Sequence, residues 1–306
     1  MRDHVSPHRI AVLTPAPDDA TYSDAWPGVL DRLAAALAGS GVEVVPLPWT
    51  AHVDDATALL DFPLVLPLLA WGYHRDHANW LRACRTWQSA GVAMANPPEV
   101  LAANSDKRYL AKLEERGIAI PPTTWTDRVD QAQVDAMFDA TGAERVIVKP
   151  TVSGGAWKTL RLRRGEALHD APEGAAMLQP YLPTIETEGE TSLLFFGGRF
   201  SHAVNKRPVP GDFRIQSEFG GDYRAVEPPP AALALARDVL AAIDAPLLYA
   251  RIDMVPDADG RWRLMEAELI EPDFYLGQAA DGGAAFAEAV RALLAARRLD
   301  HLPAIA

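Results

Sequence analysis

The sequence predicts a parallel α/β domain at the N-terminus, followed by a larger α+β region with antiparallel sheets. Strand and helix patterns alternate through the first hundred residues, as in βαβ units, which favours a parallel sheet. The segment ANPP at 95–98 then interrupts the pattern, because proline cannot take part in a strand ladder. From Glu190 onward, short strands joined by turn residues indicate antiparallel hairpins.

Three apolar runs, at 9–13, 42–47 and 62–69, predict the strands of a first domain over residues 1–97. Residues 24–37 and 76–90 carry apolar side chains at helical spacing and predict its helices. Ligands of such domains lie at the carboxyl ends of the parallel strands. The side chains that we expect there are Asp24, Trp71, Tyr73, His74 and Arg75, although Trp71 and Tyr73 could equally belong to the core.

A second predicted unit, residues 98–182, begins with a helix over 104–117 that has Asn104 or Ser105 as N-cap and Gly117 as C′ residue. Lys107 then lies in the first helical turn, where free backbone N–H groups favour an anion. The strands predicted for this unit are 144–150, 158–164 and 176–182.

The third predicted unit, residues 183–306, contains two hairpins. Gly197 and Gly198 supply the positive φ angles of a tight turn in the first hairpin. A helix over 231–243 precedes the second hairpin, and an Ala-rich helix closes the chain.

The second hairpin collects acidic residues on one face. If Asp259-Gly260 is a two-residue turn, Asp253 lies opposite Glu266, and Arg251 lies opposite Glu268. Three neighbouring carboxylates repel each other unless a cation lies among them, and such oxygen ligands suit Mg²⁺ that bridges to nucleotide phosphates. The alternatives are an Arg251–Glu268 ion pair with the other acids in water, or a turn register that shifts the pairing by one residue.

Lys149 ends a β-branched strand and precedes a corner of small residues, Ser153-Gly154-Gly155. Glycines let backbone N–H groups approach phosphate oxygens closely, although a solvated strand end and an ordinary turn would give the same pattern. In the segment QPYLP, the Pro180 carbonyl and the Leu182 N–H could pair with an adenine edge, or proline could simply end an edge strand. The sequence has neither a P-loop nor a dinucleotide-binding glycine motif.

The composition limits the partners. The 306 residues are 49% apolar and 23% charged, which is ordinary for a globular protein. The formal charge of −12 argues against nucleic acid or an anionic membrane as the main partner. No apolar stretch reaches the roughly 18 residues of a membrane span, and the N-terminus lacks the apolar core of a signal peptide. The single cysteine, Cys84, favours a reducing cytoplasm.

The order of these features, from about residue 95 to 276, resembles that of the ATP-grasp ligases. The segment 184–224 is similar to bacterial glutathione synthetases and the RimK group, with Lys206, Pro208, Arg214-x-Gln216 and Gly220-Gly221 in matching order. Three segments resemble those of the ATP-grasp proteins of antibiotic clusters, such as the cyclo-ligase of D-cycloserine formation. They read NPPEVLAANSDKRYL, GDFRIQSEFGG and LIEP.

The resemblance implies a two-lobed ATP-grasp fold behind the N-terminal domain, with ATP between the lobes. It implies that Lys107 and Lys149 contact phosphates under a lid made by Ser153–Gly155, and that Arg214 steadies the acyl-phosphate. The other implied roles are catalysis by Lys206 and Arg251, ATP binding by Gln179, Pro180, Tyr181, Leu182 and Glu190, Mg²⁺ binding by Asp253, Glu266 and Glu268, and substrate binding by Gln216.

The chain departs from the resembled families at three positions. The usual E-x-N metal motif reads Glu266-Ala267-Glu268. Ser192 stands where glutathione synthetases have a substrate-binding arginine, and Trp71-Gly72-Tyr73 replaces the W-D-Y of the cyclo-ligase group. The lost arginine and carboxylate indicate a different substrate.

The hypothesis is an ATP-dependent ligase of amino-acid-derived metabolite biosynthesis. ATP phosphorylates a small-molecule carboxylate, and an amine of the same or a second molecule attacks the acyl-phosphate, which gives an amide-type C–N bond, ADP and phosphate. A phosphotransferase and a non-catalytic nucleotide-binding module remain alternatives. Members of the resembled group often dimerise, so a homodimer is a further expectation.

Overall fold

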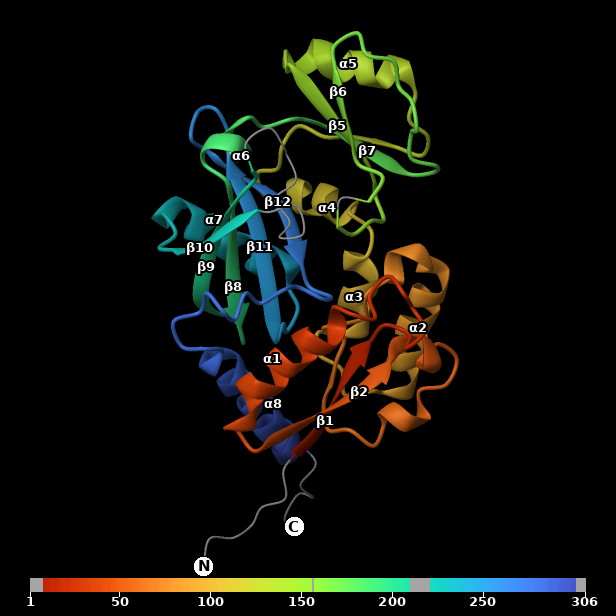
Figure 1. The fold of residues 1–306 in the computed structure, drawn as a ribbon, viewed down its shortest axis with the longest axis vertical. Coiled ribbons are helices and arrows are strands. Elements are labelled where there is room, and N and C mark those ends of the chain that lie inside the picture. The colour runs from red at the N-terminus through yellow and green to blue at the C-terminus, as the bar shows by residue number, and fades with distance from the viewer. Residues whose placement is uncertain (1–7, 156, 210–220, 301–306) are drawn as a thin grey trace, which may run out of the picture.

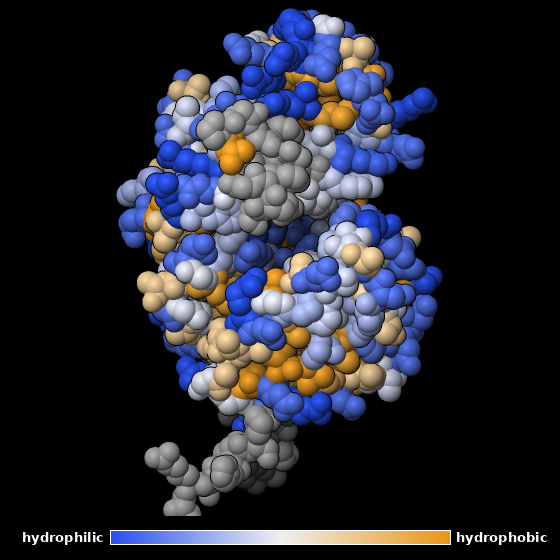
Figure 2. All heavy atoms as spheres, viewed as in Figure 1, coloured by the Kyte–Doolittle hydropathy of each residue, from blue (hydrophilic) through white to orange (hydrophobic). Residues whose placement is uncertain are grey.

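The computed structural model describes residues 8–155, 157–209 and 221–300, and these residues form three β-sheets. Figure 1 shows the parallel sheet in the lower part, the five-stranded sheet above it, and the small four-stranded sheet at the top. Figure 2 shows a recess bordered by hydrophilic residues between the lower and upper parts. The sheets are therefore arranged around a shared central space.

The N-terminal sheet is parallel, as predicted, with the order β2-β1-β3. The predicted strand 62–69 shortens to β3 (Val65–Leu66), because Pro63 and Pro67 on either side have no N–H to donate to a neighbouring strand. The other elements are β1 (His8–Thr14), α1 (Trp26–Ala38), β2 (Val42–Pro48), the 3₁₀ turns η1 (Trp49–His52), η2 (Thr57–Leu59) and η3 (Tyr73–Arg75), and α2 (His77–Ala90).

The prediction of one continuous helix over 104–117 is wrong in its first residues. Two short helices, α3 (Pro98–Asn104) and α4 (Tyr109–Glu115), replace it. Lys107 lies in the turn between them, because its N–H donates to the Thr151 carbonyl (2.8 Å) rather than to a helical carbonyl. Gly117 has φ +87° directly after the C-cap residue, which confirms it as C′.

The small sheet is antiparallel, with the order β4-β7-β5-β6. Helix α5 (Gln131–Thr141) covers it and begins with a capping box made by Asp130 and Gln133. The strands are β4 (Thr124–Thr126), β5 (Arg145–Pro150), β6 (Leu160–Arg163) and β7 (Ala176–Pro180).

The five-stranded sheet is antiparallel, with the order β10-β9-β8-β11-β12. Gly197 (φ +55°) and Gly198 (φ +74°) confirm the predicted tight turn. The elements are α6 (Thr184–Thr187), β8 (Glu190–Phe196), β9 (Arg199–Arg207), β10 (Asp222–Val226), α7 (Pro230–Ile243), β11 (Tyr249–Pro256), β12 (Trp262–Glu268) and α8 (Ala284–Asp300).

The β11–β12 hairpin has the predicted pairs but not the predicted turn. Asp253 faces Glu266, and Arg251 faces Glu268. Beyond Asp253 the register shifts by one at a β-bulge, so that Met254 faces Leu264 and the turn is one residue longer than expected. The bulge therefore restores the register at the acidic end of the hairpin.

The apolar cores join the sheets. Helix α8 returns to pack against α1 (Figure 1), and its Phe286 shares a cluster with Ile10 of β1 and Phe196 of β8. Leu110 and Leu113 of α4 pack with the five-stranded sheet. The small sheet and α5 have a core of their own, and Met177 of β7 and Trp125 of β4 join the small sheet to the apolar cluster of the five-stranded sheet.

Candidate active site

A cavity of about 310 Å³ opens where the three sheets meet. Most of its lining was predicted from the sequence. The predicted residues that line it are Tyr73, Lys107, Lys149, Ser153, Gly154, Gly155, Gln179, Pro180, Tyr181, Leu182, Glu190, Lys206, Arg251, Asp253, Glu266 and Glu268.

The two lysines predicted to contact phosphates enter this cavity from different elements. Burial alone would lower the pKa of Lys107. Its ammonium group donates to the Glu266 carboxylate, and this contact raises the pKa by more than burial lowers it. Lys149 has no carboxylate within ion-pairing distance among the described residues. Burial and the nearby Lys107 lower the pKa of Lys149 from 10.5 to about 8. Lys149 is thus a partly enclosed ammonium group without a matching anion.

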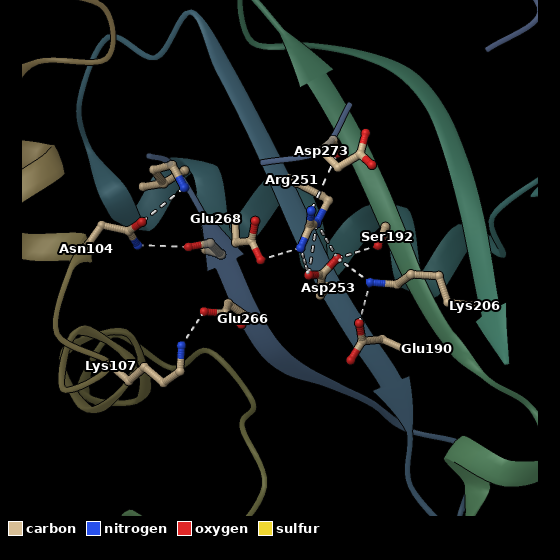
Figure 3. Close-up of polar contacts among 12 residues, drawn as sticks. Asn104, Lys107, Glu190, Ser192, Lys206, Arg251, Asp253, Glu266, Glu268 and Asp273 are labelled. Carbon is tan, nitrogen blue, oxygen red and sulfur yellow. Dashed lines mark hydrogen bonds and ion pairs between the residues drawn. The ribbon is translucent and has the colours of Figure 1, made fainter. Parts of the chain in front are cut away.

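Three acids of the cavity, Glu190, Asp253 and Glu268, pair with two cations from the five-stranded sheet (Figure 3). Arg251 donates to both oxygens of Asp253 (2.9–3.1 Å) and to Glu268. Lys206 pairs with Glu190 (2.6 Å) and lies 3.5 Å from Asp253. The Arg251–Glu268 pair that was considered as an alternative to metal binding is therefore formed.

The carboxyls of β12 differ in charge. Burial and repulsion from Glu266 and Asp253 raise the pKa of Glu268 to about 7, in spite of Arg251. Burial acts on Glu266 in the same sense, but Lys107 and Lys149 lower its pKa below the usual value. Burial of Asp253 is outweighed by Arg251 and Lys206, which hold its pKa near 2. Glu268 is therefore the carboxyl of the three that gives up its proton least readily.

The predicted Mg²⁺ ligands differ in how accessible their oxygens are. Within the described parts of the chain, no three His, Cys, Asp or Glu side chains are already arranged as metal ligands. The side chains of Glu266 (31% exposed) and Glu268 (26%) open to the cavity, so their oxygens are accessible donors. Asp253 is only 3% exposed, and Arg251 and Ser192 already bind its oxygens. Glu266 and Glu268 fit a magnesium ion, while Asp253 could ligate only through a lone pair that these contacts leave free.

The expected nucleotide segment forms one wall of the cavity. Gln179 is buried and donates to Thr123 (2.9 Å), which fixes the end of β7. Pro180 and Leu182 are partly exposed on the cavity side of this strand end. The glycine corner closes the opposite side, where the His74 ring lies so near Gly154 that a Cβ there would approach it to 3.2 Å. A side chain at position 154 would therefore push the corner away from the N-terminal domain.

Several predicted substrate residues do not line the cavity. Of the five expected from the N-terminal domain, only Tyr73 does so. Arg75 instead pairs with Asp19 and lies over the Tyr22 ring, 4.9 Å from its centroid. The other three are Asp24, Trp71 and His74. Arg214 and Gln216 lie outside the described residues.

The sequence analysis missed several lining residues. Glu271 follows Glu268 after three residues and so falls outside the alternation of Glu266 and Glu268, which is why strand spacing did not indicate it. Tyr275 has φ +47°, and its ring lies near Lys206 and Arg251, which no sequence pattern indicates. The other missed residues are Asn104, Ile147, Thr159, Ile185, Tyr223, Val255 and Met265.

The fold and cavity define an ATP-grasp ligase, an enzyme that uses ATP to form a C–N bond. The chain superposes on the crystal structure of the D-cycloserine synthetase DcsG with a TM-score of 0.78 and 28% identity, over 94% of this chain and 99% of that one. The D-alanine–D-alanine ligase of Bacillus anthracis superposes with a TM-score of 0.70 and 16% identity, over 96% and 99% of the two chains, and supports the fold.

Sequence comparison identifies the family. A family model for the N-terminal domain of the D-cycloserine synthetase DcsG matches residues 10–96. The cycloserine biosynthesis protein DcsG of Streptomyces lavendulae is 32% identical over 242 residues, 72% of this chain and 79% of that protein. The glutathione synthetase of Prochlorococcus marinus (strain MIT 9313) is 30% identical over 210 residues, 64% of each chain. The chain belongs to the DcsG family of ATP-grasp ligases. None of the helices that the structure describes is both long and apolar enough to cross a bilayer.

Proposed function

We propose that this enzyme phosphorylates the carboxylate of a small amino-acid-type molecule in the described cavity and joins it to an amine. The observation that carries the proposal is Lys149, a cation in the cavity wall that lacks a carboxylate partner among the described residues. A partly enclosed charge without a partner is costly, so its presence beside the glycine corner is best explained by an anionic ligand. The ATP phosphates provide such an anion.

We assign each residue of the cavity a role according to its position. Lys107 and Lys149 hold the phosphates, with Ser153–Gly155 above them, and Gln179–Leu182 lie along the adenine. Arg251 and Lys206, held by their carboxylate partners, stabilise negative charge that develops as the carboxylate is phosphorylated and attacked. We assign Arg214 the same role by resemblance.

Mg²⁺ is the metal that we propose for Glu266 and Glu268, with Asp253 as a third candidate. When bound, it neutralises phosphate charge and lowers the barrier to phosphoryl transfer. The protein itself orients the reactants and supplies fixed charges.

We also propose that the chain divides into the units 1–97, 98–182 and 183–306 and that two copies form a homodimer. The proposed compartment is the cytoplasm, and Cys84, a free buried thiol, supports it.

Release of ADP tests the proposed reaction. The purified enzyme, ATP and Mg²⁺ are mixed with amino acids and related acids, singly and in pairs, and ADP is measured by a coupled assay. We expect sustained ADP formation only when both a carboxylate and an amine are available, on one molecule or on two. Sustained turnover with a carboxylate alone, to a stable phosphorylated product, would indicate a phosphotransferase instead. Absence of ADP under every condition would contradict both activities.

The affinity for ATP should fall as pH rises through about 8. Lys149 attracts phosphate only while protonated, and its pKa is about 8 in the free protein. ATP binding above that pH must therefore take up a proton. We expect a dissociation constant about tenfold higher at pH 9.5 than at pH 7, because one charge-assisted contact is lost. Calorimetry with a non-hydrolysable ATP analogue measures this. Lys149→Arg, which stays charged, should weaken the dependence and leave only the part caused by the carboxyls of the cavity.

A further inference from the structure

Glu271 is a carboxylate of the cavity to which the assignments above give no role. It follows β12 at the boundary between the five-stranded sheet and the N-terminal domain. The preceding Ile270 is buried in the N-terminal core, and its carbonyl accepts a hydrogen bond from Tyr249 (2.8 Å). The N–H of Leu269 donates to Asn104 (3.0 Å). Pro272 restricts the backbone on the other side. The backbone that carries the Glu271 carboxylate is therefore held in place from both sides.

Glu271 differs from the other acids of the cavity in its partners. Glu190, Asp253, Glu266 and Glu268 each form an ion pair with a lysine or arginine. Among the residues that the structure describes, no basic side chain lies within ion-pairing distance of Glu271. Burial and the nearby charge of Glu268 raise the pKa of Glu271 to about 8, as expected for an acid that lacks a cation.

The surroundings place Glu271 where the cavity borders the N-terminal domain. Tyr73 of the N-terminal domain lines the same cavity, and Glu271 is the charged group that acts on it most strongly. The charge of Glu271 also acts to raise the pKa of Tyr22 and of Tyr249. Lys107 acts on it only weakly and is already paired with Glu266. An ammonium group brought by a ligand would supply the missing partner.

We propose that Glu271 binds the non-reacting ammonium group of the substrate whose carboxylate is phosphorylated, which makes that substrate an α-amino acid or a close derivative. This inference rests on the proposed ligase function. A nitrogen that attacks an acyl-phosphate must be unprotonated, so a carboxylate anchor suits an ammonium group that stays out of the reaction. An α-amino acid carries its ammonium two bonds from its carboxyl carbon, so one end can reach Glu271 while the other faces the phosphates.

The test compares Glu271→Gln, which keeps the shape and removes the charge, with the wild type. Glu227→Gln, at an exposed position away from the cavity, is the matched control. Each enzyme is assayed for ADP release with D- and L-amino acids and with the matching acids that lack the α-amino group, such as 3-hydroxypropionate for serine. Calorimetry gives the affinity for the amino acids that react best and for a non-hydrolysable ATP analogue.

We expect Glu271→Gln to lower kcat/KM for amino acids about 10- to 100-fold, mainly through KM, and to leave ATP affinity unchanged. Rates with the amine-free acids should match those of the wild type, however slow. An equal loss for both kinds of acid, or a higher requirement for Mg²⁺, would overturn the inference. If the wild type accepts only amine-free acids, the inference fails and the ligase function stands. If no acid elicits ADP, the ligase function fails as well.

Discussion

Replacing Lys149 with methionine should yield a protein that is more stable than the wild type and nearly inactive. The ammonium group lies in the cavity wall without a carboxylate partner among the described residues, and burial lowers its pKa from 10.5 to about 8. Methionine has a similar length and no charge to desolvate. The same change removes a fixed positive charge that we assign to the ATP phosphates. We expect the rate of ADP formation to fall about 100- to 1000-fold.

The gain in stability depends on pH in a defined sense. A lysine whose folded-state pKa is lowered destabilises the fold fully below pH 8, and this cost disappears as pH rises past its unfolded value of 10.5. The shift corresponds to about 2 kcal/mol at pH 7 after allowance for water in the cavity. For a chain of this size, Tm of Lys149→Met should rise by about 3 °C at pH 7 and by less at pH 9.5. Differential scanning calorimetry measures both values.

Lys206→Met is the matched control in the same cavity. Lys206 pairs with Glu190 at 2.6 Å and lies 3.5 Å from Asp253. Removing it leaves buried carboxylates without their cation, which costs about 3–5 kcal/mol. We expect both lysine variants to lose activity but to change Tm in opposite directions. A lower Tm for Lys149→Met would show that Lys149 already has a partner in the ligand-free protein, and would remove the main support for the phosphate site.

Local patterns predicted much of this site because strand geometry carries information over short distances. Alternation places Arg251 and Asp253 on one face of β11, and Glu266 and Glu268 on one face of β12, whatever the turn does. The register of the hairpin then decides that both pairs share the same face. The turn itself was predicted wrongly, and a bulge after Asp253 compensates for the additional residue. Pairing at the acidic end is therefore set by the packing of the sheet rather than by the turn.

Contacts between distant segments could not be predicted in this way. The position of Lys107 depends on a hydrogen bond from its backbone to Thr151, and this bond interrupts the expected helix. Arg75 was expected in the substrate site but pairs with Asp19, because Gly72 leaves space for its guanidinium group. Glu271 is part of the cavity only because Ile270 packs into the N-terminal domain. Each of these contacts joins segments from different sheets or loops, for which periodicity gives no signal.

Asn96 is the clearest case of such a contact, and its replacement by aspartate should destabilise the protein strongly. Its side chain is fully buried between the N-terminal domain and the five-stranded sheet. The amide nitrogen donates to the carbonyls of Tyr249 (3.0 Å) and Leu269 (2.9 Å), and the amide oxygen accepts from the N–H of Leu248 (2.8 Å). The Tyr249 N–H also donates to this oxygen (3.5 Å), so one side chain satisfies four backbone groups of β11 and of the segments beside it.

Aspartate keeps the acceptor and loses both donors, so that a negative oxygen faces two carbonyl oxygens. We expect a loss of about 4 kcal/mol at pH 7.5, or about 6 °C in Tm, because a buried charge is left uncompensated. The buried carboxyl should have a raised pKa, and its protonated form regains one donor. The penalty should therefore be smaller at pH 5 and grow as pH rises, whereas the loss in Asn96→Ala should stay constant between these values.

Asn104→Asp provides the comparison that separates burial from hydrogen bonding. Asn104 makes the same kind of paired contact, donating to the Ala267 carbonyl (2.8 Å) and accepting from the Leu269 N–H (3.0 Å), but it is partly exposed to the cavity. Water can solvate the new charge there, so the loss in Tm should be less than half of that at position 96. Equal losses at both positions, or an Asn96→Asp protein whose Tm does not vary with pH relative to the wild type, would contradict the argument that an unsolvated charge between the domains causes the effect.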